Sequence, residues 1–115
     1  LIYGHVISGT AYLKDDAPVE AIVGDLPFAR GDRVAVLISG LGATPLMEQY
    51  ILYGSVAERL AEAGIEVVVP LVGNFFTSLE MMGVTLSVLK LDDELDRLMR
   101  YPCASIGLKA AGATR

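Results

Sequence analysis

Short runs of consecutive apolar residues alternate along the chain with longer stretches in which apolar residues recur every three or four positions. Val34–Ser39 is mostly apolar and β-branched, which is typical of a strand covered on both faces. From about Pro45 to Ala63 the spacing is helical, and Ile65–Val69 is again a short apolar run. The pattern therefore predicts a strand, a crossover helix and a parallel strand, which form a right-handed βαβ unit.

The ends of the predicted helix carry sequence signals. Thr44 is expected to be its N-cap, and Pro45 its first residue, where the missing N–H has no cost. Gly64 is expected just beyond the helix end, and Pro70 is expected to stop the second strand. The apolar stripe expected on this helix consists of Leu46, Tyr50, Tyr53, Val56, Ala57 and Leu60.

The second half of the chain predicts three further elements. Thr77 and Glu80 have the spacing of a capping box, so a brief helix is expected there. Residues 84–91 begin with alternating apolar and polar positions, which predicts an edge or antiparallel strand with one wetter face. Asp92–Glu94 then begin a last helix, because acids at its start and arginines near its end both suit the helix dipole.

These elements predict an α/β fold, a single three-layer domain with a mixed, mostly parallel sheet. Residues 31–101 are expected to form the core. Residues 1–30 belong to the same domain but are hard to assign, although His5–Leu13 suits a strand. Residues 102–115 are expected to be a loose tail, since the segment from Gly107 onward is small and polar.

Composition narrows the classes of function. Hydrophobic residues make up 53% of the 115 residues, and the mean hydropathy is +0.51. A membrane helix needs about 18–20 consecutive apolar residues, and runs such as Ile65–Leu71 are far shorter, so no membrane segment is expected. The net charge of −5 gives no electrostatic footprint for nucleic acid. The high hydrophobic content is then explained by strands that are buried on both faces, together with a surface that meets a partner.

Gly40 and Gly42 lie between the first strand and the N-terminus of the helix, where backbone N–H groups can hold an anion. A dinucleotide fingerprint requires a third glycine where Pro45 stands, and an acidic residue at the end of the next strand, which instead ends in Val69 and Pro70. The fingerprint is therefore absent. Two interpretations stay open, a tight turn and a loop that contacts a ligand or a partner domain.

Other candidate chemistry is sparse. His5 is the sole histidine and no serine lies in a Gly-x-Ser-x-Gly elbow, so a catalytic triad is not favoured. Asp92–Glu94 is better explained by helix capping than by a metal site, so no metal is predicted. Cys103, the single cysteine, has no basic neighbour that would activate it. One cysteine allows no internal disulfide, which agrees with a cytoplasmic protein.

Two apolar pairs lie near the predicted brief helix, Phe75-Phe76 just before it and Met81-Met82 at its end. Exposed, they would form the kind of patch that marks an interface. Buried, they would belong to the core beneath a loop. Their loop leaves the carboxyl end of a strand, where ligands bind in open α/β sheets.

Three ordered blocks resemble the second domain of dihydroxyacetone (glycerone) kinases. Arg30–Tyr50, with Gly-Leu-Gly-Ala-Thr-Pro-Leu, resembles its strand–loop–helix segment. Gly73–Gly83 is similar to its Gly-x-x-x-Thr-Ser-Leu-Asp/Glu-Met-x-Gly segment, and Val84–Asp93 to its next strand and helix start. The resemblance spans residues 25–98. Ser39 departs from it, because the family commonly has asparagine before the glycine loop.

The resemblance implies phosphorylation of dihydroxyacetone or a similar short ketose. The phosphoryl group would come from ATP, or from bound ADP recharged by a phosphotransferase relay, with Mg on a partner subunit or domain. A histidine in a His-Gly-Glu-Pro-Gly motif holds the substrate in that family. His5 is followed by Val6 and Ile7, so this role is not transferred to it.

We therefore expect a chain that binds no cofactor itself, is inactive alone and serves as scaffold and interface. Its expected partners are a first kinase domain, a nucleotide-binding subunit or domain, and a second copy in a homodimer. Because the chain begins with Leu1, we interpret it as a fragment. The alternatives are a noncatalytic interaction or sensor module, and a small-ligand-binding doubly wound domain. The residues expected to contact substrate or partner are Gly40, Gly42, Thr44, Phe75 and Phe76.

Overall fold

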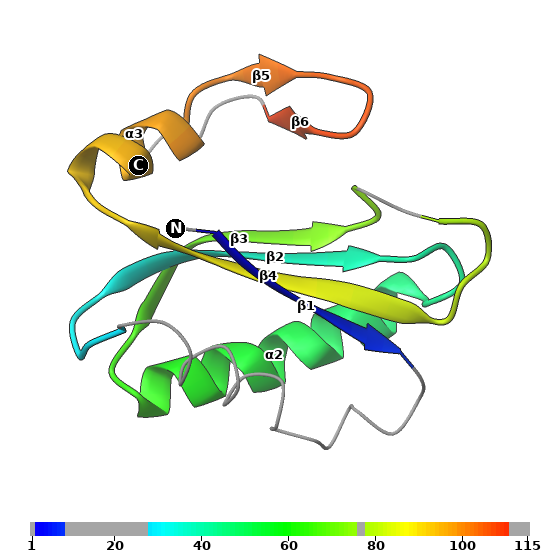
Figure 1. The fold of residues 1–115 in the computed structure, drawn as a ribbon, viewed down its shortest axis with the longest axis horizontal. Coiled ribbons are helices and arrows are strands. Elements are labelled where there is room, and N and C mark those ends of the chain that lie inside the picture. The colour runs from blue at the N-terminus through cyan, green and yellow to red at the C-terminus, as the bar shows by residue number, and fades with distance from the viewer. Residues whose placement is uncertain (1, 9–27, 76–77, 111–115) are drawn as a thin grey trace.

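The computed structural model describes residues 2–8, 28–75 and 78–110. Its elements are β1 (Ile2–Ser8), β2 (Arg33–Gly40), α2 (Leu46–Glu62), β3 (Glu66–Gly73), β4 (Gly83–Leu91), α3 (Asp93–Met99), β5 (Cys103–Ala104) and β6 (Lys109–Ala110) (Figure 1).

The described strands form a four-stranded sheet in the order β1-β4-β2-β3. β2 and β3 are parallel and are joined through α2, which confirms the predicted βαβ unit and the α/β class. β4 is antiparallel to both β2 and β1. The sheet is therefore mixed as expected, but antiparallel pairings outnumber the parallel one, because β4 returns through a loop and not through a crossover. β4 is antiparallel as predicted, and it is a central strand.

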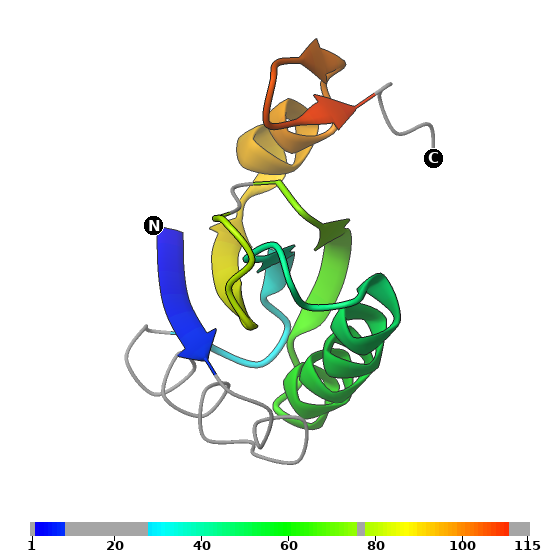
Figure 2. The same cartoon turned by 90° about the vertical axis from the view of Figure 1, so that its right-hand side faces the viewer.

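Figures 1 and 2 show α2 on one side of this sheet and α3, with the β5–β6 hairpin, on the other. The core lies between α2 and the sheet. Alternate residues of β2 and β4 supply it from the sheet, since successive side chains of a strand point to opposite faces. The core residues are Val34, Val36, Ile38, Leu52, Val56, Leu60, Ile65, Val84, Leu86 and Val88.

The C-terminal end of α2 follows the prediction and its N-terminal end does not. Gly64 has φ +76°, its N–H donates to Ala61 O at 2.9 Å, and Ile65 N–H donates to Leu60 O at 2.8 Å. These two bonds form a Schellman motif. At the other end Pro45 is the N-cap and no side chain caps the helix. The prediction of Thr44 as N-cap is wrong, because its hydroxyl bonds elsewhere.

The predicted stripe of α2 is partly wrong. The buried positions are Gln49, Leu52, Val56 and Leu60, whereas the predicted Leu46 and Tyr50 are 54% and 55% exposed. The true stripe continues from Leu52 back to a polar residue one turn earlier. A prediction based on apolar residues alone therefore selects the exposed face of α2, and not the buried one, over the first two turns of the helix.

Pro70 does not stop the second strand, because β3 continues to Gly73. In the described structure β3 pairs with β2 alone, so one of its edges has no partner strand, and proline is tolerated on such an edge. The register shifts beside Val68, which has no partner in β2. Arg100 Nη2 donates to Val68 O at 3.2 Å at this bulge.

The brief helix predicted from the capping box is not formed over Ser78–Met82, and Thr77 lies outside the described residues. The predicted final helix is confirmed as α3, with Asp92 Oδ1 accepting a hydrogen bond from Leu95 N–H at 2.8 Å. Within residues 102–115, expected as a loose tail, β5 and β6 form a two-stranded hairpin. His5 lies in β1, opposite Leu86 of β4.

Asp96 anchors α3 to the sheet. Its side chain is 9% exposed and accepts hydrogen bonds from Arg33 Nη1 at 3.0 Å and from Arg100 Nε at 2.5 Å. Arg33 also pairs with Asp93 at 2.6 Å. No helix in the described part of the chain is long and apolar enough to cross a bilayer.

Candidate functional site

The loops that follow β2 and β3 meet at one end of the sheet. Gly42 and Met81 form an isolated bridge between them. Ala43 N–H donates to Met81 O and Met81 N–H donates to Leu41 O, each at 3.1 Å. Gly42 has φ +113°, and a Cβ there would lie 2.6 Å from Ser78 O. Glycine is required because the second loop passes against the first.

Thr44 joins the same two loops through its side chain. Its hydroxyl donates to Gly83 O and accepts from Gly83 N–H, both at 2.9 Å, and Thr44 is 4% exposed. Residue 44 thus fixes the start of β4, thirty-nine positions away. Its role in this structure is to hold two segments together.

Gly40 ends β2 in a crowded polar environment. A Cβ at this position would lie 2.2 Å from both Asn74 Oδ1 and Gln49 Nε2. Gln49 Nε2 donates to Thr44 O at 3.1 Å and to Asn74 Oδ1 at 2.9 Å. Gln49 and Asn74 were not among the predicted site residues. Counting back one turn from Leu52 along the buried stripe would have found Gln49.

Ser39 and Phe75 complete this end of the sheet. The buried Ser39 hydroxyl accepts a hydrogen bond from Phe75 N–H at 3.1 Å, so a side-chain bond is made where the family commonly has asparagine. The Phe75 ring lies against Gly73, whose added Cβ would be 3.3 Å from the ring. The structure thus places Gly40, Gly42, Thr44 and Phe75 together, whereas Phe76 lies outside the described residues.

The electrostatics of this end do not favour a bound anion. The N-terminus of α2 already has Glu48 in its first turn, which compensates the helix dipole. Among the described residues, no group of three or more histidine, cysteine, aspartate or glutamate side chains could hold a metal ion.

The loop after β3 is rich in exposed apolar side chains. Leu79 is 93% exposed, Met81 48% and Met82 43%. Of the two interpretations of the methionine pair, the exposed one describes this structure. Phe75 is half-buried. An exposed apolar group of this kind is typical of a contact surface.

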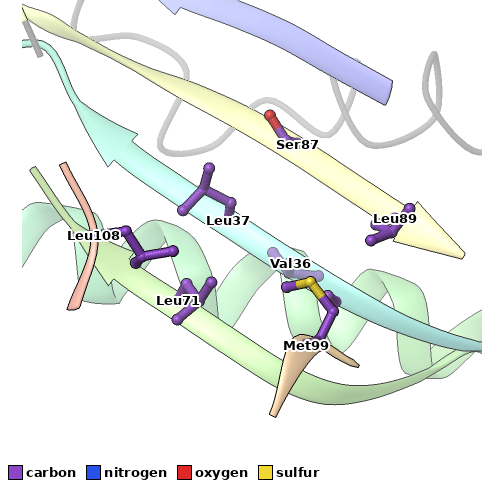
Figure 3. Close-up of a pocket in the computed structure, with 8 residues that line it drawn as sticks. Val36, Leu37, Leu71, Ser87, Leu89, Met99 and Leu108 are labelled. Carbon is purple, nitrogen blue, oxygen red and sulfur yellow. The ribbon is translucent and has the colours of Figure 1, made fainter. Parts of the chain in front are cut away.

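A separate candidate site is a hollow on the face of the sheet opposite α2. It has a volume of about 200 Å³, and Figure 3 shows Leu37, Leu71 and Leu89 of the sheet with Met99 and Leu108 beside them. The lining is apolar except for Ser87, and the complete set is Ala35, Val36, Leu37, Leu71, Ser87, Leu89, Met99 and Leu108. Parallel strands are usually covered on both faces, and here α3 and the hairpin leave this face partly open.

The described residues of both sites offer hydroxyl, amide and apolar groups, and neither site combines a nucleophile with a general base. The described elements define an α/β domain with a mixed sheet. The Dak1 domain family model matches residues 10–107. The chain belongs to the Dak1 domain family, which confirms the resemblance drawn from its three sequence blocks.

Known relatives agree with this assignment. The dihydroxyacetone-binding subunit of PTS-dependent dihydroxyacetone kinase 2 from Listeria innocua is 42% identical over 101 residues, covering 84% of this chain and 30% of the relative. L-erythrulose 1-kinase of Mycolicibacterium smegmatis is 44% identical over 99 residues, covering 82% of this chain and 17% of the relative. The chain thus spans less than a third of the length of these two relatives.

Two solved structures share the fold. A chain from a structure titled "Regulation of the Dha operon of Lactococcus lactis" has a TM-score of 0.74 at 22% identity, covering 95% of this chain and 43% of its own. A dihydroxyacetone kinase operon co-activator has a TM-score of 0.63 at 31% identity, covering 75% of this chain and 26% of its own.

Proposed function

We propose that this chain is the supporting second domain of a kinase for dihydroxyacetone or a similar short ketose, and that it is inactive alone. Family membership carries the proposal, because the relatives include dihydroxyacetone-binding subunits and erythrulose kinases. ATP, or bound ADP with Mg, would be held by a partner subunit or domain in the cytoplasm. The chain itself would contribute a rigid scaffold and interfaces.

The partly open face of the sheet supports the proposal that a partner domain packs against it. The hollow there is lined by apolar side chains from β2, β3 and β4. The chain covers 30% of a relative that binds dihydroxyacetone, so a relative of that length has more than enough chain to cover this face. We propose that a preceding kinase domain packs there. The loops that carry Gly40, Gly42, Thr44 and Phe75 would then border the substrate pocket or that domain.

A chimera tests this role. The matching segment of the Listeria innocua subunit is replaced by this chain, and dihydroxyacetone phosphorylation is measured with the partner subunits of that kinase. We expect turnover from the chimera and none from this chain alone. Leu37→Asp, in the hollow, should abolish turnover, whereas Leu98→Asp, at a half-exposed position on α3, should not. A folded chimera without turnover would contradict the supporting role.

The second candidate is a noncatalytic interaction or sensor module. The likeness to an operon co-activator at 31% identity favours this alternative. A chimera that folds, binds dihydroxyacetone and supports no phosphoryl transfer would favour it over the kinase domain.

A further inference from the structure

Large apolar side chains surround the hollow on the sheet face opposite α2, and they are only half-buried. They come from β2, β3, β4, α3 and the β5–β6 connection, and they are Leu37, Leu71, Leu89, Met99 and Leu108 (Figure 3). Single exposed apolar residues are common on protein surfaces, whereas a group of them around one concave site marks a contact. An apolar group packed there would complete their burial, which is favourable by about 25 cal/mol per Å².

The size and chemistry of the hollow indicate what fits it. Its volume is about 200 Å³, and an apolar cavity of about 150 Å³ holds a benzene molecule. One aromatic or large aliphatic side chain therefore fits, whereas a whole helix, about 10 Å wide, does not. Ser87 is the single polar residue of the lining, and a buried water needs about two to four polar partners. The hollow suits one apolar side chain better than water or a polar group.

The register of β1 places the start of this strand beside the hollow. Ile2 pairs with Leu89, and Leu89 pairs with Ala35, so this row of the sheet runs from β1 into the lining. In Figure 1 the start of β1 lies at the end of the sheet where β4 leads into α3. Any segment that precedes β1 in a longer chain therefore joins the sheet next to the hollow. Residues 111–115, at the other end of the sequence, include no large apolar side chain.

The distance to the hollow determines which upstream position reaches it. The sheet order is β1-β4-β2-β3, and neighbouring strands lie about 4.8 Å apart. The middle of the hollow, between Leu37 of β2 and Leu71 of β3, is about two and a half strand spacings from β1, or about 12 Å. A segment that also rises above the sheet, and that advances about 3.3 Å per residue, needs about four to six residues to arrive there.

We propose that the segment directly preceding β1 crosses the open sheet face and places one large apolar side chain in the hollow, from a position about four to six residues before Ile2. This inference rests on the proposed function, because the preceding kinase domain would supply the segment. It adds which part of that domain makes the contact, and the chemistry of the contact. The side chain would hold the two domains in one orientation, since it packs against three strands, α3 and the hairpin together.

Binding of toluene to the chain alone tests the hollow, because toluene resembles a phenylalanine side chain and carries no polar group. The chain has four methionines, Met47, Met81, Met82 and Met99. Only Met99 among them lines the hollow, so the methyl signals of the other three are internal controls. With ¹³C-labelled methionine methyl groups, we expect toluene to shift the Met99 signal saturably and to leave the others unchanged. An unchanged Met99 signal would overturn the inference, because the hollow would then not accept an apolar group.

Substitutions check that the shift arises in the hollow. Leu71→Trp should fill the hollow with its own side chain and remove the toluene shift of Met99, and Leu37→Trp serves the same purpose if the first variant does not fold. Leu98→Trp, at a half-exposed position on α3, is the matched control and should keep the shift. A shift that survives the filling substitution would place toluene elsewhere and overturn the inference. A shift that disappears as the chain concentration rises would assign the hollow to a second copy and overturn the upstream segment.

Cross-linking in the chimera with the Listeria innocua subunit tests which segment fills the hollow. In a cysteine-free chimera, Leu108→Cys is combined with a single cysteine at each position before β1 in turn. The control replaces Leu108→Cys by Tyr50→Cys, which is exposed on α2, on the other side of the sheet. Because a disulfide needs Cα atoms within about 7 Å, cross-linking to position 108 should peak about four to six residues before Ile2, at least about tenfold above the control.

The outcomes separate this inference from the kinase role. A chimera that has turnover but forms no cross-link to position 108 overturns the upstream segment and leaves the supporting role in place. A toluene shift of Met99 that persists in the chimera has the same consequence, since the hollow would still be open. Cross-linking without turnover retains the contact and contradicts the supporting role.

Discussion

Replacing Thr44 by valine removes the hydroxyl that joins the two loops while keeping the shape of the side chain. Gly83 N–H then loses its partner, and Gly83 O keeps a hydrogen bond from Leu41 N–H at 3.0 Å. An unsatisfied buried donor costs about 1–3 kcal/mol, and the acceptor loses one of two bonds, worth about 1 kcal/mol. We expect the free energy of unfolding to fall by about 2–4 kcal/mol.

Urea denaturation followed by circular dichroism measures this change. The loss is a large share of the roughly 6–17 kcal/mol expected for a domain of this size, and should lower Tm by about 6–24 °C. Thr44→Ser is the control, because it retains the hydroxyl and loses one methyl group, at a cost of about 1 kcal/mol. Equal stability of the valine and serine variants would refute the conclusion that the hydrogen bonds of the Thr44 hydroxyl hold the two loops together.

Three further substitutions have expected outcomes. Gly40→Ala should lower the free energy of unfolding by about 2–4 kcal/mol, measured by the same denaturation, because its Cβ displaces the buried Gln49 amide; an unchanged stability would contradict the packing there. Asp96→Ala should lower the free energy of unfolding by about 1–3 kcal/mol, which is less than the loss of a fully buried ion pair would cost, because the arginines that contact Asp96 are partly exposed. A decrease below about 0.5 kcal/mol would contradict the role of Asp96 in holding α3 to the sheet. A hydrogen bond from Ala29 N–H and, to a smaller extent, the nearby Lys90 lower the pKa of Asp32. The Asp32 carboxylate therefore stabilises the fold above about pH 4. This stabilisation is lost as the pH falls through the lowered pKa. Unfolding titrations should therefore show Asp32→Asn less stable than the parent at pH 6 and closest to it at acid pH; a constant difference would contradict this.

The parts of the fold that were predicted correctly rest on local signals. Gly64 ends α2 because a left-handed residue is needed at that position, and Asp92 caps α3 through a residue three positions away. Both relationships can be found within one turn of helix. The βαβ unit follows in the same way from two short apolar runs and the helix between them.

The errors arise where a partner distant in sequence decides the outcome. Thr44 has the pattern of an N-cap, but Gly83 competes successfully for its hydroxyl. Gln49 interrupts an apolar stripe and is buried because Asn74 and the Thr44 carbonyl bind its amide. Gly83 lies 39 positions from Thr44 and Asn74 lies 25 positions from Gln49, so no local pattern contains these two partners. The predicted set contained the glycines and Thr44, whereas Gln49 and Asn74, whose side chains bond to each other beside Gly40, were missed.

The central claim is that this chain is a supporting domain of a ketose kinase and does not transfer phosphate alone. The most direct test incubates the purified chain with dihydroxyacetone, ATP and magnesium and measures formation of the phosphorylated ketose. The account predicts no product above the protein-free control. Product that scales with chain concentration, and that disappears in a variant unable to fold, would contradict it.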